Sequence, residues 1–203
     1  MDYKNQLVLT GALNDVGASV RTNVPDSYRA GLEVEASVRL TDRLAWNANA
    51  TLSRNKIKSF TEVLYDYGVN FDEYNIVERT YKDTDISFSP GVVAASGLTY
   101  AIARNLEITW LSKYVGRQYV DNTTNNSRQL DPYFVNDLRL NYSLKPTFMR
   151  EIDISLLWNN LLNERFESNG YTWGYLGGGS EYRENYYYPQ AGANLMAMLT
   201  LKF

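Results

Sequence analysis

Hydrophobic and polar residues alternate strictly over long stretches of this chain. In SYRAGLEVEASVRLT, residues 27–41, every even position from 28 to 40 is apolar or aromatic, and the odd positions from 29 to 39 carry charge, glycine or serine. A second alternating stretch begins at Leu44, after a short turn at 41–43. Alternation with a period of two predicts β-strands with one apolar and one polar face, and the short turn predicts an antiparallel hairpin.

The same pattern predicts two further hairpins and a closing strand. One hairpin joins residues 89–100 to a strand that starts near Leu106, and the other joins FVNDLRLNYSLK to EIDISLLWNNLLNERF, residues 151–166. The opening DYKNQLVLT and the final QAGANLMAMLTLKF bring the total to about eight strands. Most of these strands are longer than the usual five or six residues.

The connections between the predicted strands alternate between short and long. Short turns fall at 41–43, 101–104 and 146–150, and long connections at 11–27, 59–87, 121–131 and 167–188. Long strands, a polar second face, this alternation and aromatic residues near strand ends are typical of outer-membrane barrels. We therefore predict an all-β fold: an antiparallel transmembrane β-barrel with short periplasmic turns and long extracellular loops, in a single domain over residues 1–203. A soluble antiparallel sandwich is the alternative, because its strands alternate too.

The amino-acid composition excludes several classes of function. The 203 residues contain no cysteine and no histidine, which excludes thiol nucleophiles, imidazole bases and Cys/His metal sites. The formal net charge of -3 offers no basic surface for nucleic acid. We therefore expect no enzyme activity, no catalytic or metal site, no cofactor and no nucleic-acid partner. An outer-membrane hydrolase or acyltransferase is a weaker alternative, since it would have to work without histidine.

Several short motifs resemble one protein family when they are taken together. WNNLLNERFESNGYTWGY and ENYYYPQAGANLMAMLTLKF resemble the C-terminal end of a TonB-dependent outer-membrane receptor, especially the Bacteroidetes type. At the other end of the chain, DYKNQLVLTGALNDVG and TNVPDSYRAGLEVE are similar to that family as well. The resemblance therefore covers essentially all of the chain.

The resemblance carries expectations about architecture and function. Such receptors have a 22-stranded barrel filled by an N-terminal plug domain, so these residues would be the last eight strands, with the plug domain absent. The implied function is capture of a scarce ligand and its import across the outer membrane of a Gram-negative bacterium with energy from the TonB system. A ferric siderophore is the first candidate ligand; cobalamin and a glycan are the others.

A complete small barrel is the main alternative to a receptor fragment. Eight strands can close on themselves, and such a barrel would act as an adhesin or a structural envelope protein. Because the chain opens inside a predicted strand, we expect a fragment instead.

Two sets of residues are candidates for functional roles. The first is a group of aromatic and basic residues in the longest connections, which could stack on ligand rings or clamp anionic groups. Its members are Tyr65, Tyr67, Tyr74, Tyr81, Tyr171, Trp173, Tyr175, Tyr182 and Arg183. Such tyrosines also form aromatic girdles and pack loop against loop. The second set is Leu199, Leu201 and Phe203, which the resemblance implies are a signal for the outer-membrane assembly machinery.

The polar face of the first hairpin contains both signs of charge. Glu33 and Glu35 lie between Arg29 and Arg39 on that face, and we expect cross-strand ion pairing to account for them rather than acid and base catalysis.

Overall fold

The computed structural model describes residues 1–203, and its regular elements are thirteen β-strands. None of its elements is a helix long and apolar enough to cross a membrane. The strands are β1 Asp2–Leu13, β2 Ser19–Arg39, β3 Leu44–Asp66, β4 Asn75–Asp85, β5 Val92–Ala103, β6 Leu106–Val115, β7 Gln118–Tyr119, β8 Gln129–Leu130, β9 Tyr133–Leu144, β10 Glu151–Asn159, β11 Glu167–Gly177, β12 Ser180–Pro189 and β13 Asn194–Lys202.

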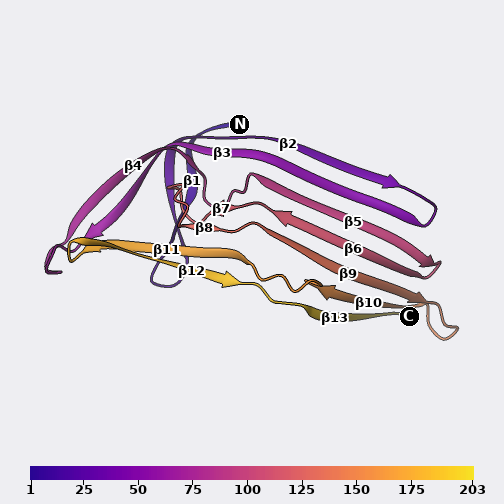
Figure 1. Cartoon of the computed structure of the whole chain (residues 1–203). Coiled ribbons are helices and arrows are strands. Elements are labelled where there is room, and N and C mark those ends of the chain that lie inside the picture. Colours follow the sequence, from indigo (N-terminus) through magenta and orange to yellow (C-terminus); the bar gives the residue numbers. More distant parts are fainter.

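Eight of these strands form one antiparallel sheet in the order β1-β2-β3-β5-β6-β9-β10-β13. The predicted hairpins and the closing strand are therefore confirmed. Figure 1 shows β2, β3, β5, β6, β9, β10 and β13 running side by side, with the short turns gathered at one end. The strands β1, β4, β7, β8, β11 and β12 gather at the other end, which we call the loop end.

The strand register places the predicted apolar positions on one continuous face. Leu32 lies opposite Leu52, and Trp46 lies opposite Leu98. The row continues from Trp110 to Leu138 and Trp158. Because side chains alternate along each strand, the intervening Glu, Asn, Thr and Lys residues form the opposite, polar face.

The apolar face is not covered by a second layer. Only 27 of 203 residues are buried, and Leu32 is 61% and Leu195 66% exposed. The one buried apolar cluster comprises Val8, Val24, Ile57, Phe60 and Ile86 and lies at the loop end, where β1 to β4 meet. A sandwich would bury an apolar face between two sheets, so the sandwich alternative is wrong.

The sheet is open. Residues 30–39 of β2 pair with β3 on one side only, because Met1 and β1 pair with residues 19–29, and β13 pairs only with β10. The eight strands do not close on themselves, so the structure does not support the alternative of a complete small barrel.

The structure corrects the predicted long connections. Most of residues 59–87 and 167–188 form hairpins, β3–β4 and β11–β12, and β2 already begins at Ser19. Residues 101–104 are not a turn as a whole, because β5 continues to Ala103 across a register shift. Loop segments rich in Tyr, Thr and Val pair with each other, as where the Thr61 and Thr80 hydroxyls lie 3.2 Å apart.

The structure also shortens the predicted strand 151–166. Strand β10 ends at Asn159, because Asn160 and Asn163 have positive φ angles of 48° and 54°. The Asn160 side chain accepts a hydrogen bond from the Glu164 backbone and donates one to the Ala191 carbonyl. The Asn-rich run is thus a turn that ties β10 to the segment before β13.

Candidate ligand-binding surface

Two long hairpins meet beyond the main sheet at the loop end. The β3–β4 hairpin and the β11–β12 hairpin are about a hundred residues apart in sequence, and a bridge between Asp66 and Leu176 joins them. The Tyr67 backbone N–H donates to the Leu176 carbonyl over 2.9 Å, and the Gly178 N–H donates to the Gly68 carbonyl over 2.9 Å. Figure 1 shows the two hairpin tips side by side.

Aromatic rings from both hairpins form one group at this junction. Tyr65 stacks on Tyr74 with 5.2 Å between ring centroids, and the Tyr67 ring lies 5.6 Å from Tyr175. Tyr175 in turn stacks on Tyr182 at 5.0 Å and on Trp173 at 5.6 Å. The aromatic cluster comprises Tyr65, Tyr67, Phe71, Tyr74, Trp173, Tyr175 and Tyr182.

The cluster combines internal packing with exposed ring faces. Tyr74 is 66% and Trp173 44% exposed, whereas Tyr67 and Tyr175 are half-buried beneath them. Phe71, which we did not single out from the sequence, lies 6.5 Å from Tyr175 and is 53% exposed. The surface can therefore stack planar or sugar rings without rearranging the rings that support it.

Three of the nine candidates lie outside this cluster. Tyr171 stacks on Tyr186 at 4.8 Å, further along the β11–β12 hairpin. Tyr81 packs against the buried apolar cluster and donates a hydrogen bond to the Glu62 carboxylate over 3.0 Å. Burial and the Glu62 charge raise the pKa of Tyr81 above its usual value. These contacts hold Tyr81 in place within the fold, and its role in ligand binding stays a prediction.

Arg183, the third of these, belongs to a set of ion pairs beneath the cluster. It contacts Glu62 at 2.8 Å and Glu181 at 3.0 Å, and its side chain is 15% exposed. Arg128 contacts Glu62 at 2.9 Å and Asp121 at 2.8 Å. The loop ion network comprises Glu62, Arg79, Asp121, Arg128, Glu181 and Arg183. Arg183 is thus already paired with two carboxylates, and its role as an anion clamp stays a prediction.

The ion pairs of this network link three segments of the chain: the β3–β4 hairpin, residues 121–128 and the strand β12. Burial lowers the pKa of Arg128, but hydrogen bonds and charge from Asp121 and Glu62 outweigh burial and raise it. Burial raises the pKa of Glu181, yet hydrogen bonds from Arg79 and Arg183 bring it below its usual value. Arg128 and Glu181 are therefore each stabilised in their ionised form by partners that include a residue from another segment, Glu62 for Arg128 and Arg79 for Glu181. No local pattern in the sequence could have paired residue 62 with residue 128.

The segment between β7 and β8 supports the loop end from below. Asn122 is fully buried, donates to the Leu9 carbonyl over 2.6 Å and accepts from the Ser87 backbone N–H over 2.8 Å. The predicted connection 121–131 is therefore a packed internal segment that contacts β1 and the loop after β4.

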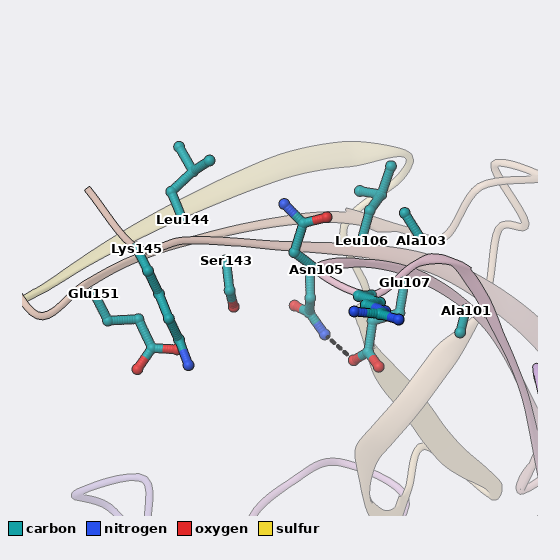
Figure 2. A pocket seen from close by; sticks show the side chains of 11 residues that line it. Ala101, Ala103, Asn105, Leu106, Glu107, Ser143, Leu144, Lys145 and Glu151 are labelled. Carbon is teal, nitrogen blue, oxygen red and sulfur yellow. Dashed lines mark hydrogen bonds between the residues drawn. The ribbon is translucent and has the colours of Figure 1, made fainter. Parts of the chain in front are cut away.

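A different cavity lies at the short-turn end. It has a volume of 630 Å³ and contains Glu107, Lys145 and Glu151 among its lining residues. Figure 2 shows these three side chains on one side of the sheet, with Leu106 and Leu144 pointing to the other. Glu151 is already paired with Lys202 at 3.1 Å, and no aromatic side chain lines the cavity. It lacks the stacking surfaces of the loop end.

The proposed assembly residues lie on the apolar face at the end of the sheet. Leu199 is opposite Ile154, Leu201 is opposite Ile152, and Phe203 follows the last strand with 89% of its surface exposed. Their role in assembly stays a prediction.

The open sheet, its continuous apolar face and its paired loop hairpins define a section of the wall of a large antiparallel β-barrel. Residues 1–161 match the family model described as TonB dependent receptor-like, beta-barrel, and the chain belongs to this family. The Bacteroidetes type stays a prediction. No curated protein matches the chain.

Solved structures show the same fold. The siderophore receptor PiuA from Acinetobacter baumannii is 18% identical with a TM-score of 0.63, over 100% of this chain and 24% of its own. The ferric yersiniabactin uptake receptor FyuA from Yersinia pestis is 18% identical with a TM-score of 0.58, over 95% of this chain and 25% of its own. The copper transporter OprC is 17% identical with a TM-score of 0.57, over 100% of this chain and 26% of its own. The chain thus spans about a quarter of the length of these proteins.

Proposed function

We propose that this chain forms the C-terminal part of the barrel wall of a receptor in the outer membrane of a Gram-negative bacterium. The receptor captures a scarce small-molecule ligand at the loop end and imports it with energy from the TonB system. TonB acts in this proposal through a plug domain supplied by sequence outside these 203 residues. The receptor makes and breaks no bond in its ligand and is therefore a transporter rather than an enzyme.

The two faces of the sheet support a membrane location. The exposed row of Leu32, Leu52, Leu98 and Trp110 would be unfavourable in water but suits contact with lipid. The opposite face, which includes Glu33, would line a water-filled lumen. Because a sheet in lipid must pair every backbone group, the open edges at β2 and β13 require further strands to complete the barrel.

The aromatic cluster is the observation that carries the ligand-capture proposal. It joins two hairpins from distant parts of the chain and leaves Tyr74 and Trp173 exposed at the end of the molecule that this orientation places outside the cell. Supported, rigid aromatic faces favour binding of ring-bearing ligands at a low entropic cost.

The comparisons favour a metal complex as the ligand class. The similar structures include a siderophore receptor, a ferric yersiniabactin uptake receptor and a copper transporter. A ferric siderophore is therefore the first candidate, ahead of cobalamin or a glycan. Insertion would use the outer-membrane assembly machinery, acting on Leu199, Leu201 and Phe203.

Uptake of labelled iron tests this proposal. A strain lacking the gene is compared with its parent, under iron limitation, for uptake of ⁵⁵Fe presented on catecholate, hydroxamate and carboxylate siderophores. The proposal expects that at least one complex enters the parent strain only, and that removal of TonB abolishes this uptake. Equal uptake of every complex by both strains would contradict the siderophore assignment.

A further inference from the structure

A polar cavity lies on the predicted lumen wall, below the aromatic cluster and separate from it. It has a volume of 760 Å³ and is formed by β2, β3 and the segment after β4. Its polar lining includes Arg29, Glu33, Asn55 and Ser89, and Phe88 provides an apolar wall. Gly31 lies between the positions of Arg29 and Glu33 on the same face of β2, and its lack of a side chain permits the close approach of β3, since a Cβ atom would lie 2.6 Å from the Leu52 carbonyl.

Arg29 is held in this cavity by neutral groups. Its Nη1 atom donates to the Asn55 Oδ1 atom over 3.1 Å and to the Ser89 Oγ atom over 3.2 Å. Asn55 is 8% exposed, and its own amide donates to the Ser53 hydroxyl over 2.9 Å. The Ser53 hydroxyl in turn donates to the Pro90 carbonyl over 3.1 Å. This chain of hydrogen bonds orients the Asn55 oxygen toward the guanidinium.

Within these residues the charge of Arg29 has no carboxylate partner. None of the ten ion pairs includes Arg29, Glu33, Glu35 or Arg39, so the cross-strand ion pairing that we predicted for this face does not form between β2 and β3. Glu33 is four positions from Arg29, and about 13 Å of extended strand separates their Cα atoms. The other three arginines that donate side-chain hydrogen bonds all contact carboxylates.

The free side of the guanidinium has the geometry of an oxyanion clamp. The Arg29 hydrogen bonds to side chains both use Nη1, which leaves the Nε and Nη2 donors without a side-chain partner. These two N–H groups point the same way and match the two oxygens of a carboxylate or a catecholate. We infer that Arg29 binds an oxyanion group of the incoming ligand, with Asn55 and Ser89 as positioning residues.

The inference that Arg29 binds the ligand rests on the proposed function. The height of Arg29 in the barrel agrees with that inference. Eleven residue steps separate Arg29 from Leu40 at the short turn, or about 36 Å of strand. With a tilt of roughly 40°, the height is about 27 Å, comparable with the apolar band of a barrel at about 25 Å. Arg29 would therefore face the lumen at its outer mouth, where a ligand released by the loops enters.

Binding of model iron complexes to the full-length receptor in detergent tests the inference. The anionic probes are ferric citrate, which offers carboxylates, and the tris-catecholate complex of iron; the neutral probe is ferric tris(acetohydroxamate). We compare the wild type with Arg29→Gln and Arg29→Lys, and with Arg21→Gln as a control on an exposed arginine of the same strand. Circular dichroism verifies that each variant is folded.

We expect Arg29→Gln to weaken an anionic probe roughly tenfold to a hundredfold, with a smaller loss for Arg29→Lys and no change for Arg21→Gln. Binding of the neutral probe should not change. Equal affinities of Arg29→Gln and Arg21→Gln for the anionic probes, or equal loss for anionic and neutral probes, would overturn the inference while leaving the proposed function intact. Failure of the wild type to bind any probe would contradict the siderophore assignment itself, and the inference with it.

Discussion

Removal of Arg128 should detach the loop end from the sheet beneath it. The Arg128 side chain is 5% exposed and contacts Glu62 and Asp121, whose side chains are 10% and 4% exposed. The substitution Arg128→Leu keeps much of the volume but leaves the buried Asp121 carboxylate without its cation and leaves Glu62 with Arg183 as its one remaining cation. The perturbation is therefore the creation of unpaired buried charge rather than the loss of a surface contact.

The magnitude follows from this burial. Removal of one partner from a buried ion pair costs about 3–5 kcal/mol, because the remaining charge keeps its desolvation penalty. At about 1.4 kcal/mol per tenfold, local opening of residues 118–130 should become roughly a hundredfold to a few thousandfold more frequent. The exposed pair of Lys4 and Asp26, with 81% of the Lys4 side chain exposed, provides the control. Lys4→Gln should cost less than about 1 kcal/mol.

Amide hydrogen exchange of the full-length protein measures both effects. We expect faster exchange at 118–130 and in β4 for Arg128→Leu, with unchanged exchange in β9 and β10. The triple variant that adds Glu62→Gln and Asp121→Asn should recover part of the protection, since no unpaired charge remains. Exchange at 118–130 that rises no more in Arg128→Leu than in Lys4→Gln would refute the reasoning.

Four further outcomes are expected. The pKa of Glu181 is lowered from its usual value of 4.5 by its ion pairs. The stability that Glu181 contributes to docking of β12 is therefore complete above about pH 4.5 and is lost as the pH falls through the folded-state pKa. Hydrogen exchange in β12 should show this pH dependence, and Glu181→Gln should reduce it. Gly11→Ala should destabilise β1 by roughly 1–3 kcal/mol, because its φ is 88° and a Cβ atom would lie 2.7 Å from the Val120 carbonyl, and exchange in β1 reports it. Trp173→Ala should weaken the binding of a ring-bearing ligand roughly threefold to tenfold, whereas Trp158→Ala on the apolar face should not. Deletion of Phe203 should reduce membrane insertion in cells more than ligand affinity in inserted protein; equal losses would count against an assembly role.

The strands were predictable because the apolar positions are local and periodic. The alternation from Tyr28 to Leu40 determines which face of β2 is apolar, and a slip of one residue would reverse it. The short turns then predict pairing within each hairpin. Pairing between hairpins crosses the long connections, so the order of the eight strands is a finding of the structure.

The loop end was less predictable because its contacts are not local. The tyrosines of residues 59–87 and 167–188 were found by residue type, but their division into the aromatic cluster and structural positions depends on the bridge between Asp66 and Leu176. Arg183 looked like a free cation because Glu62, its partner, lies 121 positions earlier in the chain. We expected Arg29 to pair with a carboxylate across strands, but the sequence could not show that its neighbours on β3 and after β4 would be the neutral Asn55 and Ser89.

The orientation of the sheet in the membrane is the central claim, and cysteine accessibility tests it most directly. These residues contain no native cysteine, so Ser180→Cys at the loop end and Asp42→Cys at a short turn can be labelled individually. In intact cells, a membrane-impermeant maleimide should label Ser180→Cys and should label Asp42→Cys only after the outer membrane is opened. Labelling of Asp42→Cys in intact cells, with Ser180→Cys protected or no more reactive, would contradict the account.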